Sequence, residues 1–257
     1  MFKKQRTIFT SSHHCTARRA QKHTREGKRE RGREYMTRPE LTQVKVKERL
    51  QMRWILLAFN RVGSNDCAKI WSAFEQAYVS KDPCTVPPEA YNALLEAAPL
   101  HLPVLFWSKT KDLVHDFTDK SSCHVTLEDT LLGTVLDGVT WCGKEGSNET
   151  FTSVCPGWSD CDNNPVRSFW NKASASYAEV ACGNVSVMLN GSILTPFSPV
   201  SIFASVEVKH FNPDVMNSLN VILVAQEKVS NCTNASLKDL QKQLAQGIAY
   251  SCQEVPE

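Results

Sequence analysis

Hydrophobic residues recur at helical spacing through much of the chain after position 53. Within residues 66–80, Ile70, Phe74 and Ala77 are three or four positions apart, which predicts an amphipathic helix. Thr126 with Asp129 resembles a capping box, and Asn164-Pro165 is a favoured pair for an N-cap and a first helical position. Together these signals predict further helices from Pro88 to just before Pro99 and over 109–119, 127–137 and 165–181.

Shorter apolar runs predict β-strands, most of them in the last third of the chain. The predicted strands cover 103–107, 185–189, 202–208 and 221–225, and a final helix capped by Ser236 and Asp239 reaches about residue 246. Residues 142–164 are rich in Cys, Gly, Asn and Ser, which predicts a loop held by disulfides.

This order of elements predicts an α/β protein with two lobes. Helices over about 54–101 and 126–181 form a helical lobe. The stretches 102–125 and 182–257 form a small α/β lobe with a short, mainly parallel sheet. The cleft between the two lobes is the expected place for a ligand site.

Charge separates the N-terminal part from the rest of the chain. Residues 1–53 contain 16 Lys and Arg residues against five Glu, whereas residues 54–257 contain 13 basic and 22 acidic residues. The basic segment has almost no apolar periodicity, so we expect it to be disordered. A basic arm that binds nucleic acid or an acidic membrane is one interpretation. A solvated tail is favoured, and no nucleic-acid partner is expected, because no aromatic residues are interleaved for base stacking.

The longest uninterrupted apolar run is Trp54–Phe59. A helix that spans a bilayer needs about 20 apolar residues, so we expect no membrane span in this chain. The run is also shorter than the usual core of a signal peptide, about 7–15 residues.

The acidic body carries features of secreted proteins. Ten cysteines are many for a cytosolic enzyme, and nine of them follow position 53. Five Asn-X-Ser/Thr sequons predict glycosylation at Asn148, Asn184, Asn190, Asn231 and Asn234. These features favour a secretory route and an extracellular or cell-surface location. No cysteine or histidine spacing matches a zinc site, and standard phosphate-loop and hydrolase motifs are absent from the sequence, so no metal is expected.

Three local patterns allow both a structural and a functional interpretation. In the predicted strand from 201 to 208, Glu207 alternates with apolar residues, which is typical of a solvent-facing side chain. Glu128 lies within an apolar arc, where burial raises a carboxyl pKa, but it also suits the first turn of a helix. Trp107 and Trp170 suit core or rim positions, or two walls that hold a flat cationic ring.

Five stretches of the body together resemble the ADP-ribosyl cyclase / cyclic ADP-ribose hydrolase family, ecto-enzymes that split NAD at the nicotinamide–ribose bond. They are LFWSKTKDLVHDFT (105–118), TLEDTLLGTVLDGVTWCG (126–143), CDNNPVRSFW (161–170), AEVACGNVSVMLNGS (178–192) and FASVEV (203–208). The resemblance extends from about Cys67 to Cys252 and leaves residues 1–53 out. It implies an α/β enzyme that needs no metal and no separate cofactor, because NAD is the substrate.

The resemblance assigns roles to ten positions. The catalytic glutamate corresponds to Glu207, and the tryptophans that flank nicotinamide correspond to Trp107 and Trp170. The remaining positions contact the nicotinamide amide, the ribose or the diphosphate, and they are Glu128, Asp137, Ser174, Ser108, Ser201, Phe203 and Lys109. Lys109 replaces the arginine of the family, which keeps the charge but loses the planar fork, so weaker NAD binding is expected. Ile202 replaces a frequent threonine.

The resemblance also implies disulfide pairings. Three follow the family directly: Cys84–Cys161, Cys142–Cys155 and Cys232–Cys252. The family partner of Cys182 corresponds to His101, and Cys123 is an additional cysteine. A shifted Cys123–Cys182 bridge is therefore expected.

Two functions remain as interpretations. The first is an NAD glycohydrolase with ADP-ribosyl cyclase and cyclic ADP-ribose hydrolase activity, for which NAD and cyclic ADP-ribose are the ligands. The second is a catalytically weak, glycosylated receptor or adhesion module of the same fold. A homodimer is compatible with either function.

Overall fold

The structure is a computed structural model that describes residues 66–100, 104–120 and 124–256. All of these residues belong to one compact unit. The predicted disordered segment 1–53, the apolar run 54–59 and Cys123 lie outside the described residues. Within the described ranges, no helix combines the length and the apolar character that crossing a membrane requires.

The first described elements are helical. They are α2 (Cys67–Tyr78), the 3-10 turn η1 (Pro88–Tyr91) and α3 (Asn92–Ala97). Asp66 caps α2, because its carboxylate accepts hydrogen bonds from the amides of Ala68 and Lys69 at 3.1 and 3.0 Å. Pro88 takes the first position of η1. The helix predicted within 66–80 is confirmed, and the helix predicted from Pro88 is a 3-10 turn followed by an α-helix.

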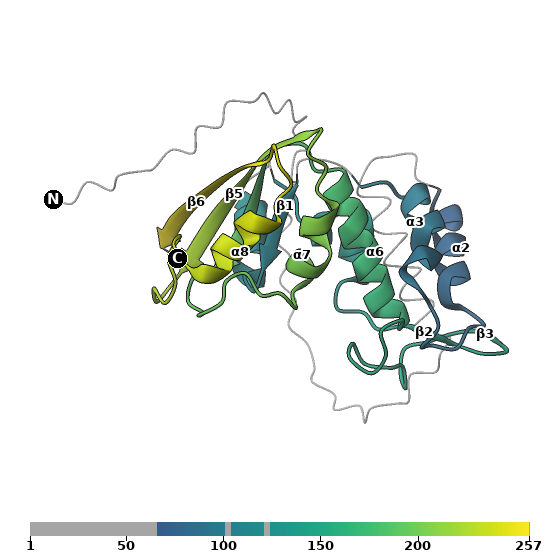
Figure 1. The fold of residues 1–257 in the computed structure, drawn as a ribbon. Coiled ribbons are helices and arrows are strands. Elements are labelled where there is room, and N and C mark those ends of the chain that lie inside the picture. The colour runs from purple at the N-terminus through teal and green to yellow at the C-terminus, as the bar shows by residue number, and fades with distance from the viewer. Residues whose placement is uncertain (1–65, 101–103, 121–123, 257) are drawn as a thin grey trace, which may run out of the picture. The chain divides into compact units, whose positions relative to one another are not determined.

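The 15-residue helix α6 (Pro165–Glu179) lies between α2 and α3 on one side and the sheet on the other (Figure 1). Asn164 caps it as predicted, since its side-chain oxygen accepts a hydrogen bond from the Arg167 amide at 2.9 Å. The Pro165 ring suits the following position, where the helix needs no amide donor.

The main sheet has four parallel strands in the order β1-β4-β5-β6. The strands are β1 (Leu105–Ser108), β4 (Gly183–Asn190), β5 (Met216–Ala225) and β6 (Ala249–Pro256). The sequence prediction missed β6, because this edge strand is mostly exposed and lacks an apolar run. Predicted strands at 103–107, 185–189 and 221–225 correspond to β1, β4 and β5.

One continuous apolar core joins the helices to one face of the sheet. On the sheet it contains Val185, Val187, Leu189, Leu219, Val221 and Leu223. The opposite face packs against α4 (Lys111–Lys120) through Val114, and the apolar residues of this second cluster are Leu105, Met188, Ile222 and Val224. Because adjacent strand residues alternate between the two clusters, both faces of the sheet are covered. The helical and α/β parts therefore share one core.

The predicted helix over 127–137 is broken in two. The structure has a 3-10 turn, η2 (Leu127–Asp129), and a separate helix, α5 (Leu131–Leu136). The capping box of Thr126 and Asp129 is confirmed. The break occurs because Thr130 is extended and caps α5 by accepting a hydrogen bond from the Gly133 amide at 3.1 Å. A Cβ atom on Gly133 would lie 2.0 Å from the Leu127 carbonyl oxygen, so only glycine allows this approach.

Two other local predictions need correction. The predicted loop 142–164 contains an antiparallel hairpin, β2 (Cys142–Lys144) and β3 (Ser147–Phe151), whose turn uses Gly146 at φ +74°. The last helix, α8 (Ala235–Gln243), starts earlier than predicted. Asn234 is its cap in place of Ser236, because the asparagine oxygen accepts a hydrogen bond from the Ser236 amide at 2.9 Å.

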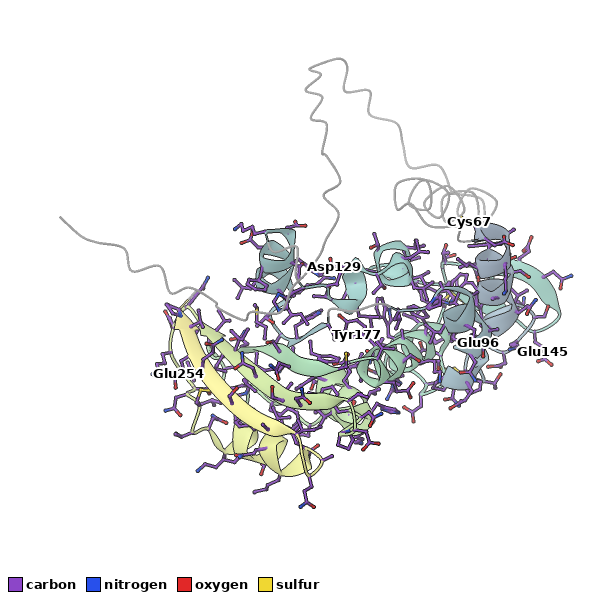
Figure 2. All side chains as sticks on the ribbon, turned by 90° about the horizontal axis from the view of Figure 1, so that it is seen from above. Cys67, Glu96, Asp129, Glu145, Tyr177 and Glu254 are labelled. Atoms are coloured by element: carbon purple, nitrogen blue, oxygen red, sulfur yellow. A yellow bond between two sulfur atoms is a disulfide. The ribbon has the colours of Figure 1, made fainter. Side chains whose placement is uncertain are left out.

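Three of the four predicted disulfides are present, namely Cys84–Cys161, Cys142–Cys155 and Cys232–Cys252. The fourth predicted bridge is Cys123–Cys182. Cys182 is an exposed free thiol between the end of α6 and the start of β4, and its predicted partner lies outside the described residues. Figure 2 shows Cys67 and Glu145 at the helical end of this unit, Glu254 on β6 at the other end, and Tyr177 between them.

Candidate active site

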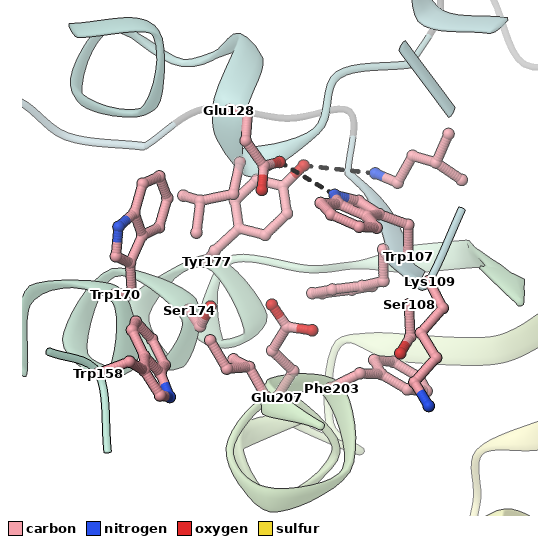
Figure 3. A pocket seen from close by; sticks show the side chains of 14 residues that line it. Trp107, Ser108, Lys109, Glu128, Trp158, Trp170, Ser174, Tyr177, Phe203 and Glu207 are labelled. Atoms are coloured by element: carbon pink, nitrogen blue, oxygen red, sulfur yellow. Dashed lines mark hydrogen bonds between the residues drawn. The ribbon is translucent and has the colours of Figure 1, made fainter. Parts of the chain in front are cut away.

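A cavity of about 300 Å³ is enclosed by segments that are far apart in the sequence: β1, η2, α6 and residues 202–207. Figure 3 shows Trp107 and Trp170 on opposite sides of this cavity. Its aromatic and polar lining side chains are Phe106, Trp107, Ser108, Lys109, Glu128, Trp158, Trp170, Ser174, Tyr177, Phe203 and Glu207. Eight of the ten side chains predicted to contact substrate are in this group.

Glu207 reaches the cavity from a helical segment, so the predicted strand over 202–208 is wrong. The Ser201 hydroxyl accepts a hydrogen bond from the Ala204 amide at 3.2 Å and caps α7 (Ile202–Ser205), and η3 (Glu207–His210) follows. Phe203 of α7 and Glu207 of η3 both line the cavity, whereas Ser201 serves as the cap and is not a lining residue.

The Glu207 carboxyl group is buried, with 7% of the residue exposed. Burial raises its pKa to about 8, because an anion is poorly solvated there. A hydrogen bond with Ser174 opposes this rise, and the charge of Glu128 adds to it. Glu207 therefore changes its protonation state close to neutral pH, a property typical of functional carboxyl groups.

Glu128 faces the cavity from η2, on the side opposite Glu207 (Figure 3). The Trp107 indole nitrogen donates a hydrogen bond to its carboxylate at 3.0 Å. The Thr134 hydroxyl donates to the Glu128 backbone carbonyl at 2.9 Å, which ties η2 to α5. Glu128 is therefore a half-buried carboxylate with a fixed orientation, and it also lies in the first turn of η2, as its structural interpretation predicted.

The helix α6 provides a second wall. Trp170, Ser174 and Tyr177 are separated by four and three residues, so they share one face of the helix. Ser174 is 3% exposed and contacts Glu207. The Trp170 ring packs edge-on against Phe169, with ring centroids 5.1 Å apart, and this contact limits its orientation.

The rim of the cavity lies at the carboxyl end of β1. Lys109 has φ 57°, a left-handed conformation that is uncommon for a lysine. Its carbonyl accepts a hydrogen bond from the Asn190 side-chain amide at 3.0 Å, and the Thr110 hydroxyl donates to the Met188 carbonyl at 3.1 Å. Both bonds attach this turn to the end of β4. The turn thereby places the buried Ser108 and the exposed Lys109 where they suit an anionic ligand.

Asp137 is the other predicted residue that does not line the cavity. It caps the end of α5, and its carboxylate accepts hydrogen bonds from the Lys111 amine at 2.9 and 3.0 Å. Both side chains are more than one third exposed. The family resemblance implied that this carboxylate contacts the nicotinamide amide, but here it is engaged in the ion pair with Lys111.

Two of the lining residues that the sequence prediction missed are Trp158 and Tyr177. Trp158 lies on the disulfide-bounded loop between Cys155 and Cys161, and 43% of it is exposed. Its carbonyl accepts a hydrogen bond from Asn164, so the same residue caps α6 and holds this loop. The sequence signal that could have identified this position is a tryptophan in a short loop between two cysteines. Tyr177 follows Ser174 by three residues, a spacing that indicated the same helix face.

The cavity combines one carboxyl group of raised pKa, a second carboxylate, facing indoles and a polar rim. Flat, positively charged rings bind well between indole faces, because stacking and cation–π attraction add together. A carboxylate in such a cavity stabilises positive charge that develops nearby. Among the described residues, no group of three or more His, Cys, Asp or Glu residues is arranged to hold a metal ion.

Solved structures of known proteins share the described fold. The described fold matches porcine CD38, in a structure complexed with a covalent intermediate, with a TM-score of 0.76 and 36% identity over 85% of this chain and 97% of that chain. It also matches Aplysia cyclase complexed with substrate NGD and product cGDPR, with a TM-score of 0.73 and 29% identity over 80% of this chain and 88% of that chain.

The sequence comparison agrees with the structural one. The chain is 39% identical over 197 residues to ADP-ribosyl cyclase/cyclic ADP-ribose hydrolase 1 of Rattus norvegicus, an alignment that covers 74% of this chain and 65% of the rat protein. The match therefore spans slightly less than two thirds of that relative. The family model for ADP-ribosyl cyclase matches residues 51–257. The chain therefore belongs to the ADP-ribosyl cyclase family.

Proposed function

We propose that this protein is an enzyme that cleaves the nicotinamide–ribose bond of NAD, giving ADP-ribose and cyclic ADP-ribose, and that it also hydrolyses cyclic ADP-ribose. One observation carries the proposal: the buried Glu207 carboxyl faces a cavity walled on opposite sides by Trp107 and Trp170. The relatives carry names that state these activities, and a porcine relative has been seen with a covalent intermediate.

The proposed reaction begins when the nicotinamide ring enters between the two indoles. The bond between the ribose anomeric carbon and the ring nitrogen breaks, and its electron pair neutralises the charge of the departing pyridinium. The sugar then develops oxocarbenium character, as in glycoside hydrolysis. The ionised Glu207 stabilises this cation or traps it covalently. The nicotinamide ring of bound NAD carries a positive charge, which favours the ionised carboxylate. Substrate binding therefore lowers the pKa of Glu207 in our proposal.

The second half of the reaction decides the product. Attack on the anomeric carbon by water gives ADP-ribose and releases a proton, whereas attack by the adenine ring of the same molecule gives cyclic ADP-ribose. Glu128 faces Glu207 across the cavity and is held by Trp107. In our proposal it contacts the carboxamide and biases this partition. In our proposal, Asp137 contributes less to binding of the nicotinamide amide than the family resemblance implied, because its carboxylate is paired with the Lys111 amine.

The diphosphate of NAD would lie against Ser108, Phe203 and the Lys109 amine at the rim. Lysine acts as a point charge without the bidentate fork of arginine, so we expect a higher KM for NAD than an arginine at this position would give. NAD is the substrate, and the proposed mechanism requires no separate cofactor or metal.

The decisive experiment measures turnover of an etheno-adenine NAD analogue by fluorescence, with products separated by chromatography. Glu207→Gln should lose about 100-fold or more in kcat, because the developing cation loses its counter-charge. Glu179→Gln, on the exposed part of α6, is the matched control and should keep wild-type activity. Equal turnover of wild type and Glu207→Gln would contradict the proposed role of Glu207 in the mechanism. Absence of turnover in both would favour the glycosylated receptor or adhesion module of the same fold.

We also infer that the chain matures on the secretory route and acts outside the cell or at its surface. Three disulfides support this, since such bonds persist in oxidising compartments. Among the sequon residues, Asn148, Asn184 and Asn231 are exposed. Asn190 and Asn234 are half-buried and donate side-chain hydrogen bonds to the carbonyls of Lys109 and Leu194, so we expect the glycans mainly on the first three.

A further inference from the structure

Tyr177 contacts three parts of the site at once, although no motif drew attention to it. It is 1% exposed, lines the cavity and follows Ser174 on α6. Its hydroxyl donates a hydrogen bond to the Val125 carbonyl, and the Leu105 amide lies 3.4 Å from the same hydroxyl. The Leu105 amide also donates to the Val125 carbonyl, at 2.9 Å. The hydroxyl therefore joins α6 to the point where two other segments meet.

These two segments carry residues that face one another in the cavity. Leu105 starts β1 and is two residues before Trp107, and Val125 is three residues before Glu128. Further along, the Trp107 indole donates its hydrogen bond to Glu128. Figure 3 shows the Tyr177 ring on the cavity wall, and the charge of Glu128 acts on the Tyr177 hydroxyl. One buried hydroxyl thus lies at the common base of the two segments whose ends form the Trp107–Glu128 pair.

The ring and the hydroxyl of Tyr177 have separable functions. The ring packs edge-on against Phe106, with centroids 5.3 Å apart, and a phenylalanine would keep this contact. Burial and the nearby carboxylates of Glu207, Glu128 and Asp129 raise the pKa of Tyr177, which keeps the hydroxyl protonated as a donor. A Tyr177→Phe substitution therefore removes the hydrogen bonds of the hydroxyl to the Val125 carbonyl and from the Leu105 amide, and it keeps the ring contact.

We propose that the Tyr177 hydroxyl is a positioning residue that holds Glu128 opposite Trp107 and so sets how the ribosyl intermediate divides between water and adenine. This inference rests on the proposed function for its effect on products. Tyr177 acts through Glu128: the hydroxyl fixes the backbone from which Glu128 reaches the carboxamide, and it takes no part in breaking a bond.

Tyr177→Phe should lower kcat for NAD by about fivefold, the change expected when the hydrogen bonds of the hydroxyl are lost, and should change KM by less than about twofold. The ratio of cyclic to linear product should change by about threefold or more. In a Glu128→Ala background, the same substitution should leave the ratio unchanged, because both act through one side chain. Tyr78→Phe is the matched control: it removes a buried hydroxyl that is bonded to Thr150 at 2.9 Å, away from the cavity. It should change neither the ratio nor kcat.

A second measurement does not depend on activity. In a nitrogen-15 spectrum, the indole resonance of Trp107, assigned with Trp107→Phe, should shift or broaden in Tyr177→Phe and stay unchanged in Tyr78→Phe. An unchanged product ratio together with an unchanged indole resonance would overturn the proposal for Tyr177 and leave the proposed function intact. If the wild type releases no nicotinamide, the proposed function fails, and the indole resonance still decides whether Tyr177 positions the Trp107–Glu128 pair.

Discussion

At the scale of single residues, the cavity places one carboxyl group, Glu207, where water reaches only a small part of it. Its pKa of about 8 is above the ordinary value of 4.5, so the native protein holds a proton there over a pH range in which the unfolded chain has lost it. Glu207 therefore favours the folded state at low pH, and this contribution is lost as the pH rises from about 4.5 to about 8.

Glu207→Gln should make the free energy of unfolding less dependent on pH within that window. The glutamine resembles the protonated acid and cannot ionise, so the variant should be more stable than wild type at about pH 9 and close to it at about pH 5. Urea denaturation at several pH values measures this difference. Glu179→Gln, which changes an exposed carboxylate, should follow the wild-type curve. Parallel curves for wild type and Glu207→Gln would contradict the raised pKa.

Ser174 opposes the rise in the Glu207 pKa, because its hydroxyl stabilises the ionised carboxylate. Ser174→Ala should therefore raise this pKa further. The mechanism needs the ionised form, so kcat/KM for NAD should increase with pH up to the Glu207 pKa of the free enzyme. In Ser174→Ala this increase should move to higher pH by up to about one unit. Ser176→Ala, outside the cavity lining, provides the comparison, and an unmoved profile in Ser174→Ala would argue against this hydrogen bond.

At the scale of elements, α6 matters most, since it carries Trp170, Ser174 and Tyr177 into the cavity. Its start depends on the fully buried Asn164. The Asn164 amide nitrogen also donates hydrogen bonds to the carbonyls of Trp158 and Cys161, at 3.2 and 2.8 Å. One side chain thus fixes both the helix and the loop that brings a third indole to the cavity.

Asn164→Ala should lower the free energy of unfolding by about 2–3 kcal/mol, because it removes a cap and also the hydrogen bonds that the buried Asn164 amide donates to the loop carbonyls. It should also raise KM for NAD by releasing the Trp158 loop. The matched control is Asn234→Ala, which removes the cap of α8 and should cost about 1 kcal/mol without a change in KM. Similar KM values for the two variants would show that the Trp158 loop does not depend on Asn164.

At the scale of the whole molecule, the disulfides close loops of very different length. Cys84–Cys161 joins residues 77 positions apart, whereas Cys142–Cys155 spans 13. The longer bond connects the segment before η1 with the segment that leads into α6. It therefore restricts the unfolded chain more and holds the Trp158 loop in the folded one.

Replacing Cys84 and Cys161 together with alanine should cost about 4–5 kcal/mol of unfolding free energy, against about 3 kcal/mol for Cys142 with Cys155. Chemical denaturation of the two double variants under identical oxidising conditions compares these losses. An equal or smaller loss for the first pair would mean that strain or residual structure outweighs the entropy of loop closure.

Much of the local structure was predictable from short stretches of sequence. The α2 helix, the Asn164 cap of α6 and the Thr126–Asp129 capping box depend on hydrogen bonds and periodicity within a few residues, so the sequence contains their signals. The family resemblance located eight of the ten expected site side chains and three disulfides, because its motifs preserve residue identity across distant segments.

Other features depended on partners that are distant in the chain. The alternation around Glu207 favoured a strand, but burial of Phe203 and the Ser201 cap favoured helical turns. The edge strand β6 exists because β5 offers it a hydrogen-bonding partner.

The sequence by itself determined where most helices begin and which chemical groups are available. Only the tertiary structure decided which groups meet. Asp137 pairs with Lys111 and does not line the cavity, and burial, with the charge of Glu128, raises the pKa of Glu207. The physical reason is the distance along the chain over which each interaction acts. Helix caps and periodicity act over a few residues, whereas desolvation and ion pairing depend on whatever the folded chain places nearby.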